Sequence, residues 1–441
     1  MTQRIEEDML VRQARAVLDF NWTGEYTMPG PRLYPHQWSW DSAFIAIGYC
    51  RYDQERATTE LRHLFEAQWK NGLLPQLVFN PFFTNYFPGP NFWHAKENPH
   101  APEHYEASGV VQPPLHATAA LYIYRHAKDR AKAREFLEYA FAKLGIWHGY
   151  LHRERDPEDE GLVYIRHPWE SGMDNSPLWD QIMQRLHLRS DQIPRYHRAD
   201  IHTVSASDRP TSDAYDRFAY LVKFFAECGY DEAKIRQDCP FLVQDVLFNS
   251  LLCKADRDLA EIARILGEDA SPHEERAKKT GNAIEGKLWD EDRGTYLDYD
   301  LVDGRLLPVY FGPNLVGPLY AGISEQDRAK RVVDTLENEG FGLADETVTP
   351  IPSYGLHGFG FSEERYWRGP VWINIDWFLM HGLEAYGYQD HAKHLRKTII
   401  ELCRTEGFHE FFDPFTGEGF GSILFSWSAA LLLDVLMEEG A

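Results

Sequence analysis

Segments with the spacing of amphipathic helices recur along most of this chain, and this recurrence constrains the fold more than any other feature of the sequence. Apolar residues return every three to four positions in one segment after another, whereas strand-like alternation is short and local. Each such segment must bury its apolar face, so the chain predicts a fold of packed helices. The predicted helices cover about 4–20, 41–69, 113–128, 130–147, 211–227, 240–252, 255–267, 271–288, 324–338, 366–386, 388–404 and 423–438.

A weak repeat at helix ends indicates how these helices are connected. Acidic residues, a turn glycine and then an aromatic residue occur in 153–165, 289–299 and 411–420. Such periodicity is typical of stacked helical hairpins. About twelve helices stacked in this way and closed on themselves form an all-α toroid, and the pattern leaves an unclosed all-α bundle open as the alternative.

No shift in composition divides the chain. It lacks a low-complexity tract or a Ser/Gly linker, so we expect residues 1–441 to form a single domain. Long loops rich in proline, glycine and aromatic residues lie between the helices, at about 70–112, 150–210 and 339–365. Because long loops in a compact domain are usually functional, we expect those at 70–112 and 339–365 to close over a small ligand.

The charge of the chain limits its partners. With 68 acidic against 45 basic residues the formal net charge is −23, which disfavours nucleic acid and anionic membranes as partners. The 5 cysteines are scattered without a CxxC spacing, as expected of reduced thiols, and residues 1–22 show helical spacing rather than the apolar core of a signal peptide. No apolar run approaches the roughly 20 residues that span a bilayer. We therefore expect a cytoplasmic protein.

The common cofactor and metal motifs are absent from the sequence. It has no GxxxxGK[ST] loop, no GxSxG and no HExxH, and the glycines of "GEGFGS" at 417–422 have the wrong spacing for a dinucleotide fold. His100 and His104 stand close together in "HAPEH", but neighbouring prolines disfavour the helix that would direct both to one metal ion. Residues 298–306 lack the bidentate glutamate of a calcium loop. We expect neither a cofactor nor a metal.

Segments that combine tryptophan or tyrosine with acids and amides point to a ligand. They are "YPHQWSWDSAF" (34–44), "HPWESGMDNSPLWD" (167–180), "ERYWRGPVWINIDW" (364–377), and "HEFFDPFTGEGFGS" with "FSWSAA" (409–430). An aromatic face can stack on the C–H groups of a sugar while acids and amides bond its hydroxyls, although the same pairing also occurs in ordinary core packing. The four segments together favour a carbohydrate site.

Hydrolysis of a glycoside requires two carboxyl groups, one protonated and one ionised. Asp174 precedes Asn-Ser-Pro, a helix-start pattern that would place its side chain on a loop facing a cavity. Asp180 falls in the following helical turn, where a structural role is favoured. Glu170 could bond sugar hydroxyls or orient Asp174.

The second carboxyl group must come from elsewhere in the chain. Glu410 in "HEFFDP" is flanked by aromatic residues that could raise its pKa by desolvation. Asp413 precedes a proline and Glu418 lies in a glycine-rich stretch, so both have the setting of turn residues. Glu410 is therefore the favoured partner of Asp174.

These motifs resemble glycoside hydrolase family 63 in its short bacterial form. The resemblance rests on "WSWDSAF", "ESGMDNSPLWD", "YWRGPVWINIDW" and "HEFFDPFTGEGFGS...FSWSAA", spans about residues 30–432, and is greatest to the mannosylglycerate and glucosylglycerate hydrolases of that family. It implies an (α/α)6 barrel and hydrolysis of an α-glycoside with inversion. It also implies that Asp174 is the general acid and that Glu410 is the general base that activates water.

The same resemblance implies which residues bind the substrate. Tyr34 and Tyr86 are similar to residues on the aglycone side. Arg32, Arg217 and Tyr34 are candidates to bind the carboxylate of a glycerate aglycone. The positions similar to those that line the sugar pocket are Trp40, Asp41, Gln112, Arg217, Trp367 and Trp372.

The sequence therefore predicts an enzyme that hydrolyses 2-O-α-D-mannosyl-D-glycerate, 2-O-α-D-glucosyl-D-glycerate or both, releasing the sugar and D-glycerate. An α-glucosidase or trehalase-like hydrolase of another small α-glycoside is the first alternative. A sugar- or solute-binding helical toroid without turnover is the second. The sequence leaves open the choice between mannose and glucose, and whether the chain forms a homo-oligomer.

Overall fold

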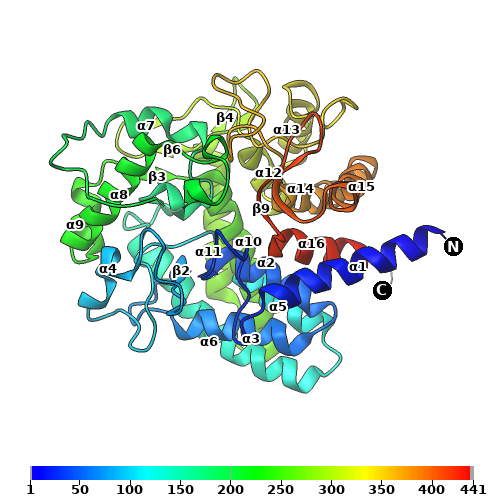
Figure 1. Ribbon diagram of the computed structural model, residues 1–441, viewed down its shortest axis with the longest axis horizontal. Helices are drawn as coiled ribbons and strands as arrows, with labels where there is room; N and C mark the ends of the chain where they lie inside the picture. The colour runs from blue at the N-terminus through cyan, green and yellow to red at the C-terminus, as the bar shows by residue number, and fades with distance from the viewer. Residues whose placement is uncertain (1, 199, 438–441) are drawn as a thin grey trace.

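A closed ring of helices forms the centre of the molecule (Figure 1). The computed structural model describes residues 2–198 and 200–437. The inner helices are α2 (Ser39–Cys50), α5 (His116–His126), α10 (Val246–Leu266), α12 (Gly312–Tyr320), α14 (Ile373–Ala385) and α16 (Ser426–Met437). Each packs on the next in this order, and α16 packs on α2. The chain is thus a helical barrel, as the sequence predicts, and not an unclosed bundle.

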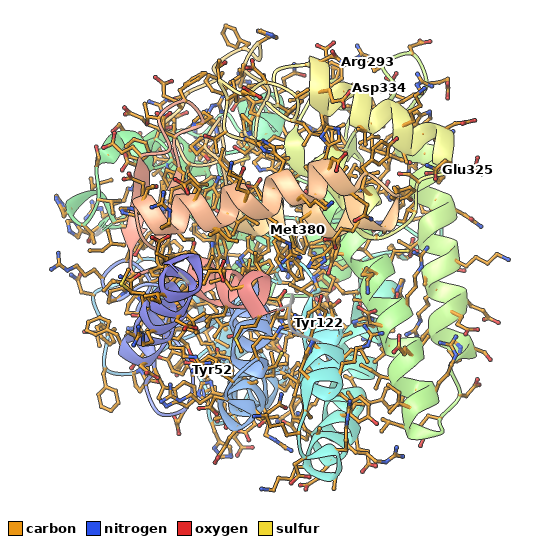
Figure 2. The ribbon with its side chains drawn as sticks, turned by 90° about the vertical axis from the view of Figure 1, so that its right-hand side faces the viewer. Tyr52, Tyr122, Arg293, Glu325, Asp334 and Met380 are labelled. Atoms are coloured by element: carbon orange, nitrogen blue, oxygen red, sulfur yellow. The ribbon has the colours of Figure 1, made fainter. Side chains whose placement is uncertain are left out.

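A second set of helices surrounds this ring. These outer helices are α1 (Thr2–Asn21), α3 (Gln54–Glu66), α6 (Arg130–Glu154), α11 (Ser271–Ala283), α13 (Gln326–Asn338) and α15 (Gln389–Thr405). α1 lies along α16, α3 packs on α2, α6 on α5 and α10, α11 on α10, α13 on α12, and α15 on α14. Figure 2 shows the result: Met380 of α14 lies in the interior, whereas Glu325 and Asp334 lie at the outer edge.

The two sets of helices differ in sequence as their positions require. The inner helix α2 is buried at every position, and its residues are apolar or small with few exceptions. The outer helix α13 buries Ala329, Val332, Val333 and Leu336, which recur at helical spacing on one face. A helix that is apolar all round must be buried, and one with a single apolar stripe packs at the surface. The barrel therefore follows from two kinds of helical pattern.

Helix boundaries differ from the sequence prediction where a polar side chain caps a helix. The predicted helix 41–69 is two helices, because the Asp53 carboxylate accepts a hydrogen bond from the backbone N–H of Arg56 and starts α3. The predicted helices 240–252 and 255–267 are the single helix α10. Asp245 caps its start through the N–H of Phe248, and Gly267, with φ +83°, ends it.

The inner helix α12 was missed by the sequence prediction. It is only 9 residues long and contains Pro313 and Pro318, which disfavour helix in a sequence pattern. Pro313 lies in the first turn, where its missing N–H costs nothing, and every residue of the helix is buried. Tertiary packing therefore outweighs local propensity here.

Further helices lie between those of the barrel. Among them are α4 (Pro90–Trp93), α7 (Asp180–Gln184), α8 (Ser212–Glu227) and α9 (Glu232–Asp238), which lie together on the left of Figure 1. The remaining short helices are η1 (Ala95–Glu97), η2 (Pro168–Ser171), η3 (Pro177–Trp179), η4 (Asp200–His202), η5 (Ala206–Asp208) and the π-helical turn η6 (Ile284–Leu288). Within the described part of the chain, no helix has the length and hydropathy needed to cross a membrane.

The strands are short and antiparallel. β1 (Gln37–Trp38) pairs with β2 (Leu77–Val78), and β6 (Tyr299–Asp300) lies between β3 (Val243–Gln244) and β7 (Arg305–Leu306). Two of the predicted repeat units are hairpins, namely β4 (Trp289–Asp290) with β5 (Thr295–Tyr296), and β8 (His409–Phe412) with β9 (Gly419–Ile423). In the second hairpin Phe411 pairs with Phe420, next to Glu410.

Candidate active site

A cavity lies where inner helices begin. Trp40 and Asp41 reach it from the first turn of α2, and Trp427 reaches it from the first turn of α16. The empty space between its walls is about 660 Å³, including its opening to solvent. We call it the central cavity. Its polar lining consists of Asp41, Gln76, Gln112, Asp174, Arg209 and Glu410, and its aromatic lining of Tyr34, Trp38, Trp40, Tyr86, Phe87, Trp93, Trp169, Tyr215, Tyr366, Phe425 and Trp427.

The hairpin β8–β9 holds Glu410 in the wall of this cavity. One carboxylate oxygen, Oε1, accepts a hydrogen bond from the Tyr34 hydroxyl at 2.6 Å. The other, Oε2, accepts one from the backbone N–H of Ser422 at 2.9 Å. Gly421 of β9 makes this approach possible, because a Cβ atom there would lie 2.6 Å from Oε2 of Glu410. The carboxylate is therefore fixed at both oxygens.

Arg209 is the cation nearest to this carboxylate among the lining residues. Its Nη1 donates to the Tyr34 hydroxyl at 2.8 Å and lies 4.0 Å from Oε1 of Glu410. Its guanidinium also lies 4.6 Å from the ring centre of Tyr366, and its Nε donates to Asp200 at 3.3 Å. Burial raises the pKa of Glu410, while Arg209 and Tyr34 oppose that rise by stabilising the charged form.

Asp174 faces the same cavity from the loop after η2. Gly172 precedes it with φ +75°, and a Cβ atom there would lie 2.5 Å from the indole of Trp40. Burial raises the pKa of Asp174 to about 7; Arg209 opposes this rise and the negative charge of Glu410 adds to it. At neutral pH Asp174 is therefore protonated in a large fraction of molecules. Glu410 has the stronger donors around it, so the pair can hold one proton and one charge.

The remaining polar groups of the cavity lie beside Trp40. Gln112 accepts a hydrogen bond from the backbone N–H of Trp40 at 3.2 Å through its side-chain oxygen, which leaves the amide nitrogen as a donor. Asp41 is buried, and desolvation raises its pKa well above the ordinary value. Acids and amides thus surround an aromatic floor, the arrangement expected of a sugar site.

Several of the predicted residues gather in the central cavity. Asp174, Glu410, Tyr34, Trp40, Asp41, Tyr86 and Gln112 all line it. Asp180 has the structural role that the sequence favoured, since it starts α7 and forms a two-pronged ion pair with Arg368 at 2.8 and 2.7 Å. Asp413 is a turn residue as expected, because it accepts from the N–H groups of Phe415 and Thr416.

Glu170 does not line the central cavity. It is fully buried, and its oxygens accept from Arg155 at 2.8 and 2.9 Å and from the backbone N–H groups of Arg166 and Val111. Burial alone would raise the pKa of Glu170, but Arg155 and Arg166 hold it below the ordinary value. The sequence leaves Glu170 either to bond a sugar or to orient Asp174. Both carboxylate oxygens accept from protein donors, so the geometry fits the second role.

Two tryptophans and two arginines also lie elsewhere. Trp367 and Trp372 are fully buried and stack on each other with ring centres 3.9 Å apart, behind the wall that Trp40 and Tyr366 form. Arg32 is exposed at the surface. Arg217 lies on α8 outside the central cavity, where it lines a second cavity and donates to the carbonyl of Asp213 at 3.0 Å. The arginine in the cavity wall is Arg209, not Arg32 or Arg217, because α8 turns Tyr215 and not Arg217 toward the cavity.

Some lining residues were not predicted. Tyr366 and Trp427 belong to the motifs "ERYWRGP" and "FSWSAA", so their aromatic character within those motifs was an available signal. Arg209 lies outside every motif, in an irregular stretch between η5 and α8. Its only sequence signal is a cation between an acid and a proline, which is common in loops.

The chain matches a described protein family along most of its length. The family described as "Mannosylglycerate hydrolase MGH1-like glycoside hydrolase domain" matches residues 34–428. A mannosylglycerate hydrolase of Rubrobacter radiotolerans is 63% identical over 97% of this chain and 97% of its own length. A mannosylglycerate hydrolase of Thermus thermophilus is 41% identical over 96% and 99%, and a glucosylglycerate hydrolase of Mycolicibacterium hassiacum is 35% identical over 97% and 97%.

Solved structures agree with this match. The crystal structure of a family 63 mannosylglycerate hydrolase from Thermus thermophilus, in complex with Tris and D-glycerate, superposes with a TM-score of 0.90 at 41% identity, covering 96% of this chain and 99% of that one. Neutral trehalase from Saccharomyces cerevisiae shares the fold alone, with a TM-score of 0.57 at 18% identity over 93% of this chain and 73% of that one. The resemblance drawn from the motifs is confirmed: this chain is a glycoside hydrolase of family 63 and belongs to its mannosylglycerate hydrolase MGH1-like members.

Proposed function

We propose that this enzyme hydrolyses 2-O-α-D-mannosyl-D-glycerate, 2-O-α-D-glucosyl-D-glycerate or both, to the free sugar and D-glycerate. The names of relatives that are 63%, 41% and 35% identical over nearly the full chain support these two substrates. The observation that carries the proposal is the combination of two carboxyl groups of unlike pKa with a buried arginine in one small cavity. The carboxyl pair suits glycoside cleavage, and the arginine suits an acidic aglycone.

We infer that Asp174 is the general acid and Glu410 the general base. Asp174 donates its proton to the glycosidic oxygen as the bond to the anomeric carbon breaks. Glu410 takes a proton from a water molecule, whose oxygen attacks that carbon from the opposite face, so the product sugar has the inverted configuration. The hydrogen bonds from Tyr34 and Ser422 support this role, since they keep Glu410 ionised and in place.

Arg209 is the proposed partner of the glycerate carboxylate. It is buried, lines the cavity and already donates to the Tyr34 hydroxyl, so a carboxylate placed beside them would meet a cation and a phenol. Tyr86 and Tyr215 line the same part of the wall, since both are influenced by the charges of Arg209 and Asp174. The sugar ring is assigned to the region of Trp40, Asp41 and Gln112.

We further propose that the barrel is of the (α/α)6 type and forms one domain. The support is the alternation of inner and outer helices along the chain, with α1, α3, α6, α11, α13 and α15 outside the ring. The proposed loops over the substrate are about 70–112, 150–210 and 339–365. Tyr86 comes from the first loop, Asp174 and Arg209 come from the second, and Tyr366 directly follows the third. Cytoplasmic location and the absence of cofactor and metal stay predictions, and the sequence leaves the oligomeric state open.

A panel of small glycosides tests the function. Both glycerate glycosides would be supplied beside trehalose, kojibiose and nigerose, with the product anomer followed by NMR before it mutarotates. We expect release of sugar from at least one glycerate glycoside, first as the β-anomer. Release from neither glycerate glycoside would refute the proposal, and activity on trehalose alone would favour the trehalase-like alternative, whose substrate has no carboxylate for Arg209 to bind.

A non-catalytic sugar-binding role is the second alternative. It predicts that replacing Asp174 by Asn or Glu410 by Gln leaves the measured function intact. The proposed enzyme predicts loss of turnover with retained binding of the glycoside. Binding can be measured by calorimetry on each variant, so the two outcomes are separated on the same samples.

A further inference from the structure

A second cavity shares the side chain of Asp174 with the central cavity. It is bordered by the start of α8, by 174–184 and by 360–368, and its empty space is about 930 Å³ including its opening to solvent. Three arginines line it, and we call it the arginine pocket. They are Arg217, Arg365 and Arg368. Three carboxyl residues, Asp174, Asp180 and Asp213, line it as well, so its charge depends on which arginines they neutralise.

The three arginines are neutralised to different extents. Arg368 is fully engaged by Asp180 through two hydrogen bonds. Arg217 pairs with Asp213, whose side chain is 79% exposed, and such a pair within a surface helix is weak. Arg365 donates to the carbonyl of Ser207 at 3.4 Å, and no carboxylate of residues 2–198 or 200–437 lies within 4.0 Å of it. The pocket therefore contains a cation without an anionic partner.

Buried donors beside the pocket add to its positive potential. Nε of Arg217 and Nδ2 of Asn175 are both buried without an acceptor. Asn175 is held in this orientation because its side-chain oxygen accepts from the backbone N–H of Trp367 at 3.0 Å. An unsatisfied buried donor is costly, and a nearby anion reduces that cost. These donors therefore favour an anion in the pocket over a neutral molecule.

The wall between the two cavities is thin and consists of residues of the active site. Tyr366 lines the central cavity, while its neighbours Arg365 and Arg368 line the arginine pocket. Asp174 lines both. A general acid at this position releases the leaving group next to itself, so the acidic product forms at the boundary with the arginine pocket.

We propose that the arginine pocket is a second binding site for a small hydroxycarboxylate, free D-glycerate, which the acidic product occupies after cleavage and which is distinct from the central cavity. Arg365 is its principal contact, and Arg217 contributes. The substrate class rests on the proposed function. The site itself takes any anion of this size, whereas the neutral analogue glycerol lacks the charge that the pocket attracts.

The test uses the Glu410→Gln variant, because Glu410 does not line the arginine pocket and turnover of bound glycoside is slow without it. With the central cavity saturated by unlabelled glycoside, added ¹³C-labelled D-glycerate is observed by NMR line broadening. We expect broadening to persist under saturation, and labelled glycerol to show none. Loss of broadening once glycoside is added would mean that glycerate binds only in the central cavity, and would overturn the proposal.

A second substitution identifies the pocket. Glu410→Gln combined with Arg365→Gln should reduce the affinity for labelled D-glycerate at least fivefold, whereas Glu410→Gln combined with Arg189→Gln should not change it. Substitution of Arg189, in the irregular stretch after α7, removes the same charge, but Arg189 is 72% exposed and does not line the pocket. An equal effect of both pairs, or an effect of neither, would contradict the assignment to Arg365.

Failure of the proposed function is recognised separately. Wild-type enzyme that releases no sugar from either glycerate glycoside refutes the substrate assignment. In that case binding of labelled D-glycerate is measured without glycoside. Weaker binding to Arg365→Gln than to Arg189→Gln would still show that the arginine pocket binds the anion. If a glycerate glycoside is hydrolysed but D-glycerate does not bind in the arginine pocket, the second site is refuted and the proposed function stands.

Discussion

At the scale of single residues, the active site depends on keeping two carboxyl groups in different protonation states. Glu410 receives hydrogen bonds at both oxygens, while Asp174 sits in a buried position that raises its pKa to about 7. The proposed acid and the proposed base are therefore distinguished by their surroundings and not by residue type. The predictions at this scale test that distinction.

Asp174→Asn and Glu410→Gln should each lower kcat by about 10²- to 10⁴-fold, because each removes one proton transfer. Neither change creates a cavity, and neither removes an ion pair shorter than the 4.0 Å contact between Arg209 and Glu410. Thermal unfolding should therefore shift little. Activity close to wild type in Glu410→Gln would refute the base assignment and direct attention to Glu418 or Asp413.

The pH profile of kcat/KM should be bell-shaped, with its optimum on the acidic side of neutrality. Activity rises as Glu410 loses its proton, at a pH above the ordinary glutamate value because its pKa is raised. Activity falls as Asp174 loses its proton near pH 7. The two groups are coupled, so each limb reports the pair. Residual activity of Asp174→Asn should lack the alkaline limb, and persistence of that limb would assign it to another group.

Gly421→Ala should lower kcat by roughly 10²-fold, because the new Cβ atom displaces the base and small displacements of a catalytic group are costly. Gly417→Ala is the matched control. Both glycines lie on the β8–β9 hairpin with positive φ, +71° and +76°, but a Cβ atom at Gly417 meets only Leu402, at 3.4 Å. Gly417→Ala should lose about 1–2 kcal/mol of stability through backbone strain, and Gly421→Ala should lose more, because its Cβ atom also lies 2.7 Å from the buried ring of Phe411. Equal losses of kcat would mean that backbone strain, not the clash with Glu410, is responsible.

At the scale of elements, η2 and the loop that carries Asp174 are held by a buried ion cluster. Glu170 on η2 pairs with Arg155 at the end of α6, and Glu232 at the start of α9 pairs with both Arg155 and Arg166. These groups join segments that are distant in sequence. None of these four charged residues lines the central cavity, so the cluster supports the segment that carries Asp174 without facing a ligand there.

Glu170→Gln should lower the free energy of unfolding by about 3–5 kcal/mol, because Glu232 then remains as the one carboxylate for two buried arginines and one positive charge is left uncompensated. Asp180→Asn also breaks a carboxylate–arginine pair near Asp174, but that carboxylate is 44% exposed, so its loss should cost less than about 1 kcal/mol. Chemical denaturation of both variants gives the comparison. The contribution of Glu170 should be full above its unfolded-state pKa and vanish as pH falls through its lowered folded-state pKa.

The periodicity of apolar residues predicts that a helix is present better than it predicts where the helix begins and ends. The sequence motifs predict the two carboxyl groups of the site better than the residues that hold them in place. The outer helices carry a one-sided apolar pattern, so α13 and α15 were predicted almost to the residue. α12 was not predicted, because its prolines disfavour helix and only burial compensates. Asp174 and Glu410 stood in recognisable motifs. Arg209 did not, since its position depends on contacts with Asp200 and Tyr34 that exist only after folding.

At the scale of the whole molecule, the ring depends on the seam between its first and last inner helices. Arg51, just after α2, lies 2.6 Å from Asp434 of α16, and both side chains are almost fully buried. The other oxygen of Asp434 accepts from the indole N–H of Trp377 on α14 at 2.9 Å. One carboxylate therefore ties together three inner helices whose order in the sequence gives no sign of their contact.

Asp434→Ala should lower the free energy of unfolding by about 1–3 kcal/mol, since it removes a buried carboxylate to which Arg51 and the indole N–H of Trp377 both bond. Kinetic constants at a temperature well below the unfolding midpoint should stay within about twofold. Ten residues of helix, or about 15 Å, separate Asp41 in the cavity from Arg51 at the seam. A large loss of kcat in folded Asp434→Ala would show that the seam also sets the geometry of the active site.

The closure of the ring has a consequence for chain order. α1 and α16, the first and last helices, pack on each other, and Figure 1 shows them side by side. The helix contacts of the barrel therefore do not depend on which helix comes first in the sequence. A gene that joins the two ends through a flexible linker and opens the chain in the exposed turn between α10 and α11 would encode the same set of helix contacts in a different order. Such a circular permutant would keep Asp174 and Glu410 in one cavity with their positions along the chain reversed.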